Sequence, residues 1–305
     1  MNVVIFACQK IGIECLKFLA KRRDAEISLV VTHERAVDAI FGYASVAEYC
    51  RKAGIPFVES AHAGPELLAR IRAMAPDMIF SIYYRGILPG ELVHLPPRGS
   101  VNIHPSLLPD YRGPVPTAWA LENGEKYFGV TIHKMDAAID TGDILVQEKY
   151  PILEDETGYE LFERAMRLGA RLFKRHFPAI ASGRLRARKQ KGIGSYYGKK
   201  NGRAVLDWRR KGEEIRNLVR VYAKPYNRVE TRLLNRQVWI NHVRVLKDRR
   251  YPAQGPGRIL KVLPGGRLVV SCADGCVVLD DYEMAPKLAA RERGFFLKAG
   301  NKFES

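Results

Sequence analysis

Cysteine is scarce in this chain, and long apolar segments are missing. Five cysteines in 305 residues, irregularly spaced, do not suggest a disulfide framework. There is no run of about 18 apolar residues and no basic-then-apolar signal segment. Residues 1–7 instead have the apolar, Val- and Ile-containing pattern of a first β-strand. We therefore expect a cytoplasmic protein that does not enter a membrane.

Several common binding motifs are also absent. The loop Ala7–Gly12 has one glycine where a dinucleotide-binding loop needs three, which excludes an NAD site of that kind. The sequence contains neither a Walker loop, nor a metal-binding histidine pattern, nor a Gly-x-Ser-x-Gly elbow. Cys272 and Cys276 bracket Ala-Asp-Gly, which favours a β-hairpin over a metal site because no second cysteine pair exists. We expect activity to need no metal.

Positive charge is abundant but unevenly distributed. The net charge is +17, and residues 181–261 alone contain 23 Lys/Arg against 5 Asp/Glu. Such a bias favours a phosphate-bearing partner, either nucleic acid or a nucleotide-linked metabolite. A solvated, solubilising surface would have the same composition, so the charge leaves these alternatives open.

Short Val- and Ile-rich runs alternate with segments of helical period in the first half of the chain. This alternation predicts an α/β fold, with a Rossmann-like, doubly wound, mostly parallel sheet and helices on both faces. Thr157 predicts the start of a long helix to about residue 181, with Glu160 completing a capping box. The predicted strands are 3–7, 27–33, 77–84, 101–103, 128–135 and 144–151, and the predicted helices are 12–22, 45–53 and 66–74.

The pattern changes after Gly183. Residues 184–202 are basic and glycine-rich, which is typical of a linker. One helix, 213–222, and five short strands follow. Strands at this close spacing suggest a small β-barrel or sandwich, and we expect a C-terminal domain that is β-barrel-like and OB-like. We therefore divide the chain into a domain of residues 1–183, a linker of 184–202 and a domain of 203–305. The five strands are 228–234, 238–246, 257–262, 267–273 and 276–280.

The stretch SVNIHPSLLPDYRG, residues 100–113, carries the strongest chemical signal. In a strand ending at Pro105, Asn102 and His104 point to the same face. The segment Gly129–Ile144 predicts another strand followed by an acidic loop containing Asp136 and Asp140. An amide, an imidazole and a carboxylate together suit stabilisation of an oxyanion during a proton transfer. Taken singly, a strand-end histidine is more often structural, and Asp140-Thr-Gly-Asp143 is an ordinary turn.

These motifs together resemble the folate-dependent formyltransferases. The resemblance rests on Asn102-x-His104-Pro-Ser-Leu-Leu-Pro-x-Tyr-Arg-Gly113, Gly129-Val-Thr-x-His133 and Asp140-Thr-Gly-Asp143. Phe41-Gly-Tyr-Ala-Ser45 and Phe80-Ser-Ile-Tyr-Tyr-Arg85 most resemble the nucleotide-sugar N-formyltransferases, such as the formyltransferase domain of the polymyxin-resistance enzyme acting on UDP-4-amino-4-deoxy-arabinose.

The resemblance implies a formyl donor and a set of site residues. N10-formyltetrahydrofolate would present its formyl group beside Asn102 and a protonated His104, whose pKa Asp140 would raise. The implied donor-binding residues are Gly86, Ile87, Leu88 and Pro114 together with Asp136, Ala137, Ala138, Ile139 and Asp140. Tyr43, Tyr84 and Arg112 are expected to contact the acceptor.

The acceptor can be one of two kinds. The first hypothesis is the amine of a nucleotide-linked sugar, with UDP or dTDP as the nucleotide. The enzyme would then act in cell-surface polysaccharide or glycan biosynthesis, and we expect it to be a homodimer. Methionyl-tRNA is the second. The tRNA enzymes carry a long basic loop after their second strand, whereas residues 34–45 here are short and contain only one basic residue, Arg35.

Position 114 is proline where the aminoarabinose enzyme has an arginine, which leaves the particular sugar open. A non-catalytic RNA-binding protein is disfavoured because residues 181–261 lack interleaved aromatic residues.

Overall fold

A computed structural model describes residues 1–34, 42, 45–200, 202–248, 251 and 254–304. It divides the chain into two compact units. The first unit comprises Met1–Pro116, Tyr127–Pro151 and Glu163–Lys199, and the second comprises Thr117–Lys126, Ile152–Phe162 and Lys200–Ser305. The domain boundaries that we expect at residues 183 and 203 stay predictions.

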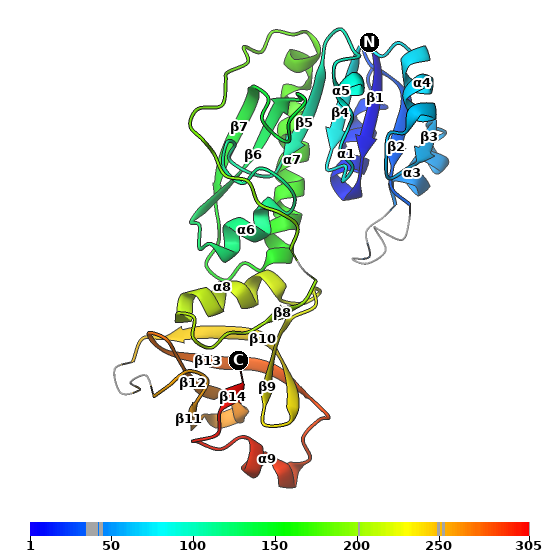
Figure 1. The fold of residues 1–305 in the computed structure, drawn as a ribbon. Helices are drawn as coiled ribbons and strands as arrows, with labels where there is room; N and C mark the ends of the chain where they lie inside the picture. The colour runs from blue at the N-terminus through cyan, green and yellow to red at the C-terminus, as the bar shows by residue number, and fades with distance from the viewer. Residues whose placement is uncertain (35–41, 43–44, 201, 249–250, 252–253, 305) are drawn as a thin grey trace. The chain divides into compact units, whose positions relative to one another are not determined.

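The first unit is organised around one seven-stranded sheet with the order β3-β2-β1-β4-β5-β6-β7 (Figure 1). The strands from β3 to β5 are parallel, whereas β6 is antiparallel to β5 and β7 is antiparallel to β6. The mostly parallel sheet expected from the alternating pattern is therefore confirmed. Its strands are β1 Asn2–Ala7, β2 Glu26–Thr32, β3 Phe57–Glu59, β4 Met78–Ile82, β5 Ser100–His104, β6 Tyr127–Lys134 and β7 Ile144–Pro151.

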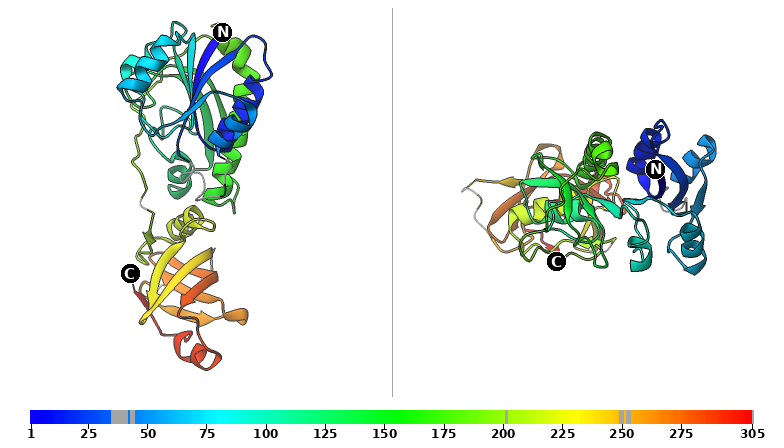
Figure 2. Two further views of the ribbon diagram at one scale, coloured as in Figure 1. Left: turned by 90° about the vertical axis from the view of Figure 1, so that its right-hand side faces the viewer. Right: turned by 90° about the horizontal axis from the view of Figure 1, so that it is seen from above.

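Helices cover both faces of this sheet, as the left view of Figure 2 shows. On one face, α1 (Gln9–Leu19) and α7 (Gly158–Ala181) meet through Phe18 and Phe173, whose rings are edge-to-face at 6.3 Å. Phe173 also packs on Phe80 of β4. On the other face, α4 (Pro65–Ala73) buries Ile71 against β1, β2 and β4. The other helices between β2 and β6 are α3 Val46–Ala53, α5 Gly90–Val93 and α6 Pro116–Glu122.

The start of α7 follows the predicted capping box. The backbone N–H of Thr157 donates to Glu160 Oε2 at 2.9 Å, and the N–H of Glu160 donates back to Thr157 Oγ1 at 3.3 Å. Two of the backbone donors at this helix end are thus satisfied by side chains, as the S/T-x-x-E spacing requires.

The second unit contains a sheet with the order β11-β12-β13-β10-β9-β14, with β8 added beside β9. Backbone bonds from Ile259 to Asn301 and from Phe303 to Gly257, both 2.8 Å, join the two ends and close the sheet into a barrel. The predicted C-terminal β-barrel is therefore confirmed. The elements are β8 Ala204–Val205, α8 Gly212–Tyr222, β9 Val229–Leu233, β10 Arg236–Leu246, β11 Ile259–Val262, the 3₁₀ turn Pro264–Gly266, β12 Leu268–Cys272, β13 Gly275–Ala285, α9 Ala290–Phe296 and β14 Phe303–Glu304.

The barrel interior is apolar apart from a few satisfied groups. Trp208 is fully buried, and its indole N–H donates to Thr231 Oγ1 at 3.1 Å. Thr231 in turn donates to the backbone oxygen of Glu304 at 2.9 Å. Helix α8 packs on this core through Ile215 and Val219. Cys272 and Cys276 flank the β12–β13 hairpin as predicted, and both are free thiols.

The elements that the sequence pattern did not predict are short. They include β3, α5 and α9, which have three, four and seven residues. Such segments lack a full hydrophobic period, so tertiary contacts decide their conformation. Among the described residues, no helix combines the length and apolar character needed to span a bilayer.

Candidate active site

Strand β5 places Asn102 and His104 at the carboxyl end of the parallel part of the sheet. Both side chains lie on the same face because residues two apart in a strand do so. The antiparallel register of β5 and β6 sets Asn102 opposite His133 and His104 opposite Thr131. The site predicted from residues 100–113 is thus extended by a histidine on the neighbouring strand.

The loop after β6 carries Asp140 into contact with this strand end. Asp140 Oδ1 accepts a hydrogen bond from Asn102 Nδ2 at 3.3 Å, and Oδ2 lies 3.4 Å from His104 Nδ1. Oδ2 also accepts the backbone N–H of Gly113 at 2.9 Å. The side chains of His104 and Asp140 are only 6% and 12% exposed. The three residues predicted to be catalytic therefore form one cluster, in which the His104 side chain is buried and Asn102 is partly exposed.

His133 completes the cluster, although the sequence reasoning gave it no role. Its Nδ1 lies 2.7 Å from the backbone oxygen of Lys134, which can only accept, so Nδ1 carries the proton. Its Nε2 lies 3.1 Å from Asn102 Nδ2, which can only donate, so Nε2 accepts. The strand alternation of Gly129–Lys134 was the available signal, because it places His133 on the same face as Thr131.

The ionisation of Asp140 follows from its neighbours. Burial raises its pKa, but the imidazoles of His104 and His133, which are cations at the acid pH where a carboxyl titrates, and the Gly113 N–H outweigh burial and hold the pKa of Asp140 well below the usual range. Asp140 is consequently an anion at neutral pH.

His104 differs from the expectation. Burial lowers its pKa below 6.5, while Asp140 and the Tyr111 carbonyl oppose this change only in part, and His133 adds to it. In the free protein burial thus disfavours the protonated His104 that the resemblance implies, because desolvation outweighs the attraction of Asp140. Its Nε2 donates to the backbone oxygen of Tyr111 at 2.8 Å, which leaves Nδ1 without a proton in the neutral ring.

The predicted donor-binding residues after β4 lie on a tightly constrained loop. A Cβ added to Gly86 would lie 2.6 Å from Tyr84 Cε1 and 2.7 Å from the backbone oxygen of Ala61, so only glycine fits there. Ile87 is 72% exposed, whereas Leu88 is buried in the core with Leu92. The loop therefore offers backbone groups and one exposed apolar side chain.

The predicted acidic loop is organised by Asp136. Its Oδ1 accepts from the backbone N–H of Ala138 at 3.2 Å and from Thr141 Oγ1 at 2.6 Å. Ala137 and Ala138 are exposed, and Ile139 is 39% exposed. Pro114, half-buried, follows Gly113 and thus lies next to the residue whose N–H binds Asp140.

Two of the three residues predicted to contact the acceptor have structural partners of their own. The Tyr84 hydroxyl donates to the backbone oxygen of Ser60 at 2.8 Å, and its ring stacks on His33 with centroids 4.5 Å apart. Arg112 donates to Gln190 Oε1 from Nε at 3.2 Å and from Nη2 at 2.7 Å. Tyr43 and most of the loop 34–45 lie outside the described residues. The acceptor contacts stay predictions.

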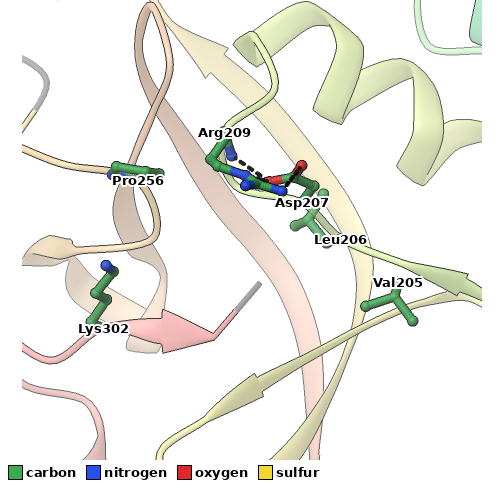
Figure 3. A pocket seen from close by; sticks show the side chains of 6 residues that line it. All are labelled: Val205, Leu206, Asp207, Arg209, Pro256 and Lys302. Atoms are coloured by element: carbon green, nitrogen blue, oxygen red, sulfur yellow. Dashed lines mark hydrogen bonds and ion pairs between the residues drawn. The ribbon is translucent and has the colours of Figure 1, made fainter.

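A separate hollow of about 380 Å³ lies on the barrel (Figure 3). Val205, Leu206, Pro256 and Lys302 line it, together with an ion pair in which Arg209 Nε lies 2.8 Å from Asp207 Oδ1. None of the predicted site residues that the structure describes contributes to this hollow. Among the described residues there is also no group of three or more His, Cys, Asp or Glu that could hold a metal ion.

Solved structures with the same fold cover nearly the whole chain. A sugar 3N-formyltransferase, WlaRD, solved with dTDP and 5-N-formyl-THF, is 20% identical with a TM-score of 0.70, over 94% of this chain and 99% of that chain. An N-formyltransferase from Helicobacter canadensis, in complex with folinic acid and dTDP-3-aminofucose, is 20% identical with a TM-score of 0.71, over 91% and 98%. Methionyl-tRNA formyltransferase from Clostridium thermocellum is 18% identical with a TM-score of 0.58, over 82% and 95%.

Two family matches divide the sequence between them. Residues 3–176 match the formyl transferase family, and residues 199–298 match the formyl transferase C-terminal domain. The first match alone spans more than half of the 305 residues and contains Asn102, His104, His133 and Asp140. The chain belongs to the formyl transferase family.

Proposed function

We propose that this formyltransferase moves the formyl group of N10-formyltetrahydrofolate to the amine of a nucleotide-linked amino sugar, with dTDP or UDP as the nucleotide. The observation that carries the proposal is the cluster that Asn102 and His104 at the end of β5 form with Asp140, around the buried imidazole of His104. The likeness to solved sugar N-formyltransferases over more than nine-tenths of the chain supports the choice of acceptor.

The residues near the cluster suit a folate donor. A pterin ring is flat and carries hydrogen-bonding groups on its edge. The exposed apolar side chains of Ile87, Ile139 and Val115 lie on the three loops that flank the cluster and would cover the ring faces. The backbone of Gly86–Leu88 and Asp136–Asp140 would bond the ring edge. When bound, the folate supplies the activated formyl group, and the protein supplies orientation and proton transfer.

The reaction begins with attack of the neutral amine on the formyl carbon. The new C–N bond forms as the carbonyl electron pair moves onto oxygen, so negative charge develops there. Asn102 Nδ2 is the side-chain donor at this position. Because the cluster is largely shielded from water, a donor fixed there stabilises the oxyanion more than it would in solvent.

His104 then moves the proton. We assign its unprotonated Nδ1 as the acceptor of the proton that the amine nitrogen loses. The imidazolium so formed lies between the Tyr111 carbonyl and the Asp140 carboxylate, which both stabilise it. The electron pair of the oxyanion re-forms the C=O bond as the C–N10 bond breaks, and the His104 imidazolium gives its proton to N10 of the folate. His104 thereby returns to its neutral form.

Substrate binding must change one contact in the cluster. Asn102 Nδ2 faces both His133 and Asp140, at 3.1 and 3.3 Å. An oxyanion needs one of these hydrogens, and the longer contact, to Asp140, is the weaker of the two. We therefore expect Asn102 to turn this hydrogen toward the formyl oxygen, while its bond to His133 keeps the amide in place.

The wider setting is also a proposal. We propose that the enzyme acts in the cytoplasm, in the synthesis of cell-surface polysaccharide, lipopolysaccharide or another glycan, and that two copies pair through the C-terminal part. Light scattering coupled to size-exclusion chromatography would test the pairing. A mass of one 34.5 kDa chain at micromolar concentration would contradict it.

A substrate panel tests the proposed function. The protein and N10-formyltetrahydrofolate are incubated with UDP-, dTDP- and GDP-linked amino sugars bearing the amine at different carbons, and mass spectrometry follows the gain of one formyl group. We expect formylation of a UDP or dTDP sugar. The matched control is the His104→Ala variant, which removes the proton acceptor. Formylation of methionyl-tRNA with no formylation of any sugar would favour the tRNA function, which the basic residues 181–261 would then serve.

A further inference from the structure

A segment predicted to be part of a linker lies against both loops of the active site. We call residues 188–197 the strap. Ile144, at the end of the acidic loop, exchanges backbone hydrogen bonds with Arg188 at 2.8 and 2.9 Å. Arg112 donates its backbone N–H to Ser195 at 2.9 Å and accepts that of Tyr197 at 3.0 Å. The strap therefore fixes the loop that ends in Gly113 and the loop that carries Asp140.

One side chain of the strap joins these two loops directly. The amide nitrogen of Gln190 donates to the backbone oxygens of Asp140 and Gly142, at 2.8 and 2.9 Å. Its amide oxygen accepts from Arg112 Nε and Nη2. Only an amide can do both, because it has two donor hydrogens on one atom and an acceptor on the other.

The acidic loop needs such support because its conformation is strained. Asp140 has φ 56°, in the left-handed region that side chains disfavour. A Cβ added to Gly142 would lie 1.9 Å from the backbone oxygen of Lys134, so the loop also approaches β6 closely. The bonds from Gln190 fall on the carbonyls of these same two residues. They hold Asp140 where its carboxylate meets His104 and the Gly113 N–H.

We propose that Gln190 is a positioning residue for formyl transfer, which acts by holding the Asp140 carboxylate against His104. The expected fall in kcat rests on the proposed function. The expected change in the titration of His104 rests only on the geometry of the cluster. The groups that titrate beside His104 are Asp140, with its carboxylate 3.4 Å away, and His133, with ring centroids 6.4 Å apart. Displacement of Asp140 removes its favourable charge from His104.

Two variants and one control test the proposal. Gln190→Leu removes all the side-chain bonds. Gln190→Glu keeps an acceptor for Arg112 but sets carboxylate oxygens against the carbonyls of Asp140 and Gly142. Gln237→Leu is the matched control, because Gln237 donates to Glu230 on the barrel at 3.1 Å. We expect kcat to fall roughly tenfold to a hundredfold in both Gln190 variants, with the KM of the formyl donor changed much less.

The titration of His104 provides a reading that needs no substrate. Histidine NMR on the free protein should give a lower pKa for His104 in Gln190→Leu, which adds no charge, than in the wild type, and no change in Gln237→Leu. In an Asp140→Asn background, Gln190→Leu should lower kcat only a little further, since both changes affect the same interaction. An unchanged titration of His104 in Gln190→Leu, or a full additional loss in the double variant, would overturn the proposal. A shifted titration in a protein that formylates no sugar would reject the proposed function and leave the positioning role standing.

Discussion

The two units bury polar side chains for different purposes. Among the described residues of the first unit, three histidines are buried, and two of them, His104 and His133, meet Asp140. In the barrel, the described buried polar side chains include Thr231 and Ser271 but no histidine. Thr231 links Trp208 to Glu304 and has no ionisable partner. The comparison separates buried groups that can move protons from buried groups that only satisfy hydrogen bonds.

Removal of the imidazole gives the largest expected effect. His104→Ala should lower the single-turnover rate of formyl transfer by about 10²–10³, and Asn102→Ala should fall in the same range, because each removes a preorganised group. The control is His242→Ala, which removes a barrel histidine that is half exposed beside Asp280. If His104→Ala reacted at nearly the wild-type rate, the buried histidine would be structural. That result would contradict the difference drawn between the two units.

Removal of the carboxylate charge is expected to have a smaller effect. Asp140→Asn keeps the size and an acceptor for the Gly113 N–H but removes the anion beside His104. We expect the rate to fall by roughly a hundredfold at most, because Asp140 acts through His104. Asp280→Asn, at a barrel carboxylate paired with Arg244, is the matched control. Equal rate losses in the two variants would show that the effect is not specific to the cluster.

The pH dependence sharpens the same comparison. Since burial lowers the pKa of His104 below 6.5, the ring stays neutral through the neutral range and is protonated only on acidification. Activity that needs neutral His104 should therefore be retained at neutral pH and be lost as pH falls below the ordinary histidine value. A rate profile from about pH 5 to about pH 8 measures this. An acidic limb centred above pH 7 would mean that Asp140 outweighs burial.

Two buried threonines provide a paired test with smaller effects. Thr231→Val leaves the Trp208 N–H and the Glu304 carbonyl without their partner, so it should lower the free energy of unfolding by about 1–3 kcal/mol. Thr131→Val should destabilise by a similar amount, because Thr131 donates to Ser106 at 2.7 Å and accepts from Gln147 at 2.9 Å. Chemical denaturation measures both.

Only the change next to the active site should alter catalysis. Thr131 lies opposite His104 and bonds the loop that follows it, whereas Thr231 lies in the barrel. We therefore expect kcat to fall in Thr131→Val and to stay unchanged in Thr231→Val. The same loss of kcat in both variants would indicate that general stability, and not the position of the loop, limits the rate.

Local patterns predicted the long elements and the core of the site. The apolar runs of β1 and β4 and the capping box of α7 act over neighbouring residues, so the sequence alone reveals them. Asn102, His104 and Asp140 could be found because they stand in ordered motifs. Their side chains do converge, as the strand-end argument predicted.

Other features depend on contacts that local sequence does not encode. His133 stands in one of the ordered motifs, but its contact with Asn102 depends on the β5–β6 register, which places the two residues opposite each other. Gln190 contacts Asp140 across 50 residues, from a segment whose composition suggested only a linker. The lowered pKa of His104 depends on how deeply the finished fold buries it, and no motif records that depth.

A competition experiment tests the central claim most directly. N10-formyltetrahydrofolate with a labelled formyl group is supplied to the enzyme together with methionyl-tRNA and the UDP- and dTDP-linked amino sugars, each at the same concentration. The account predicts that the label enters a nucleotide-linked sugar in the wild type and is lost from it in the His104→Ala variant. Label that enters methionyl-tRNA alone, or that still enters the sugar at the wild-type rate without His104, would contradict the account.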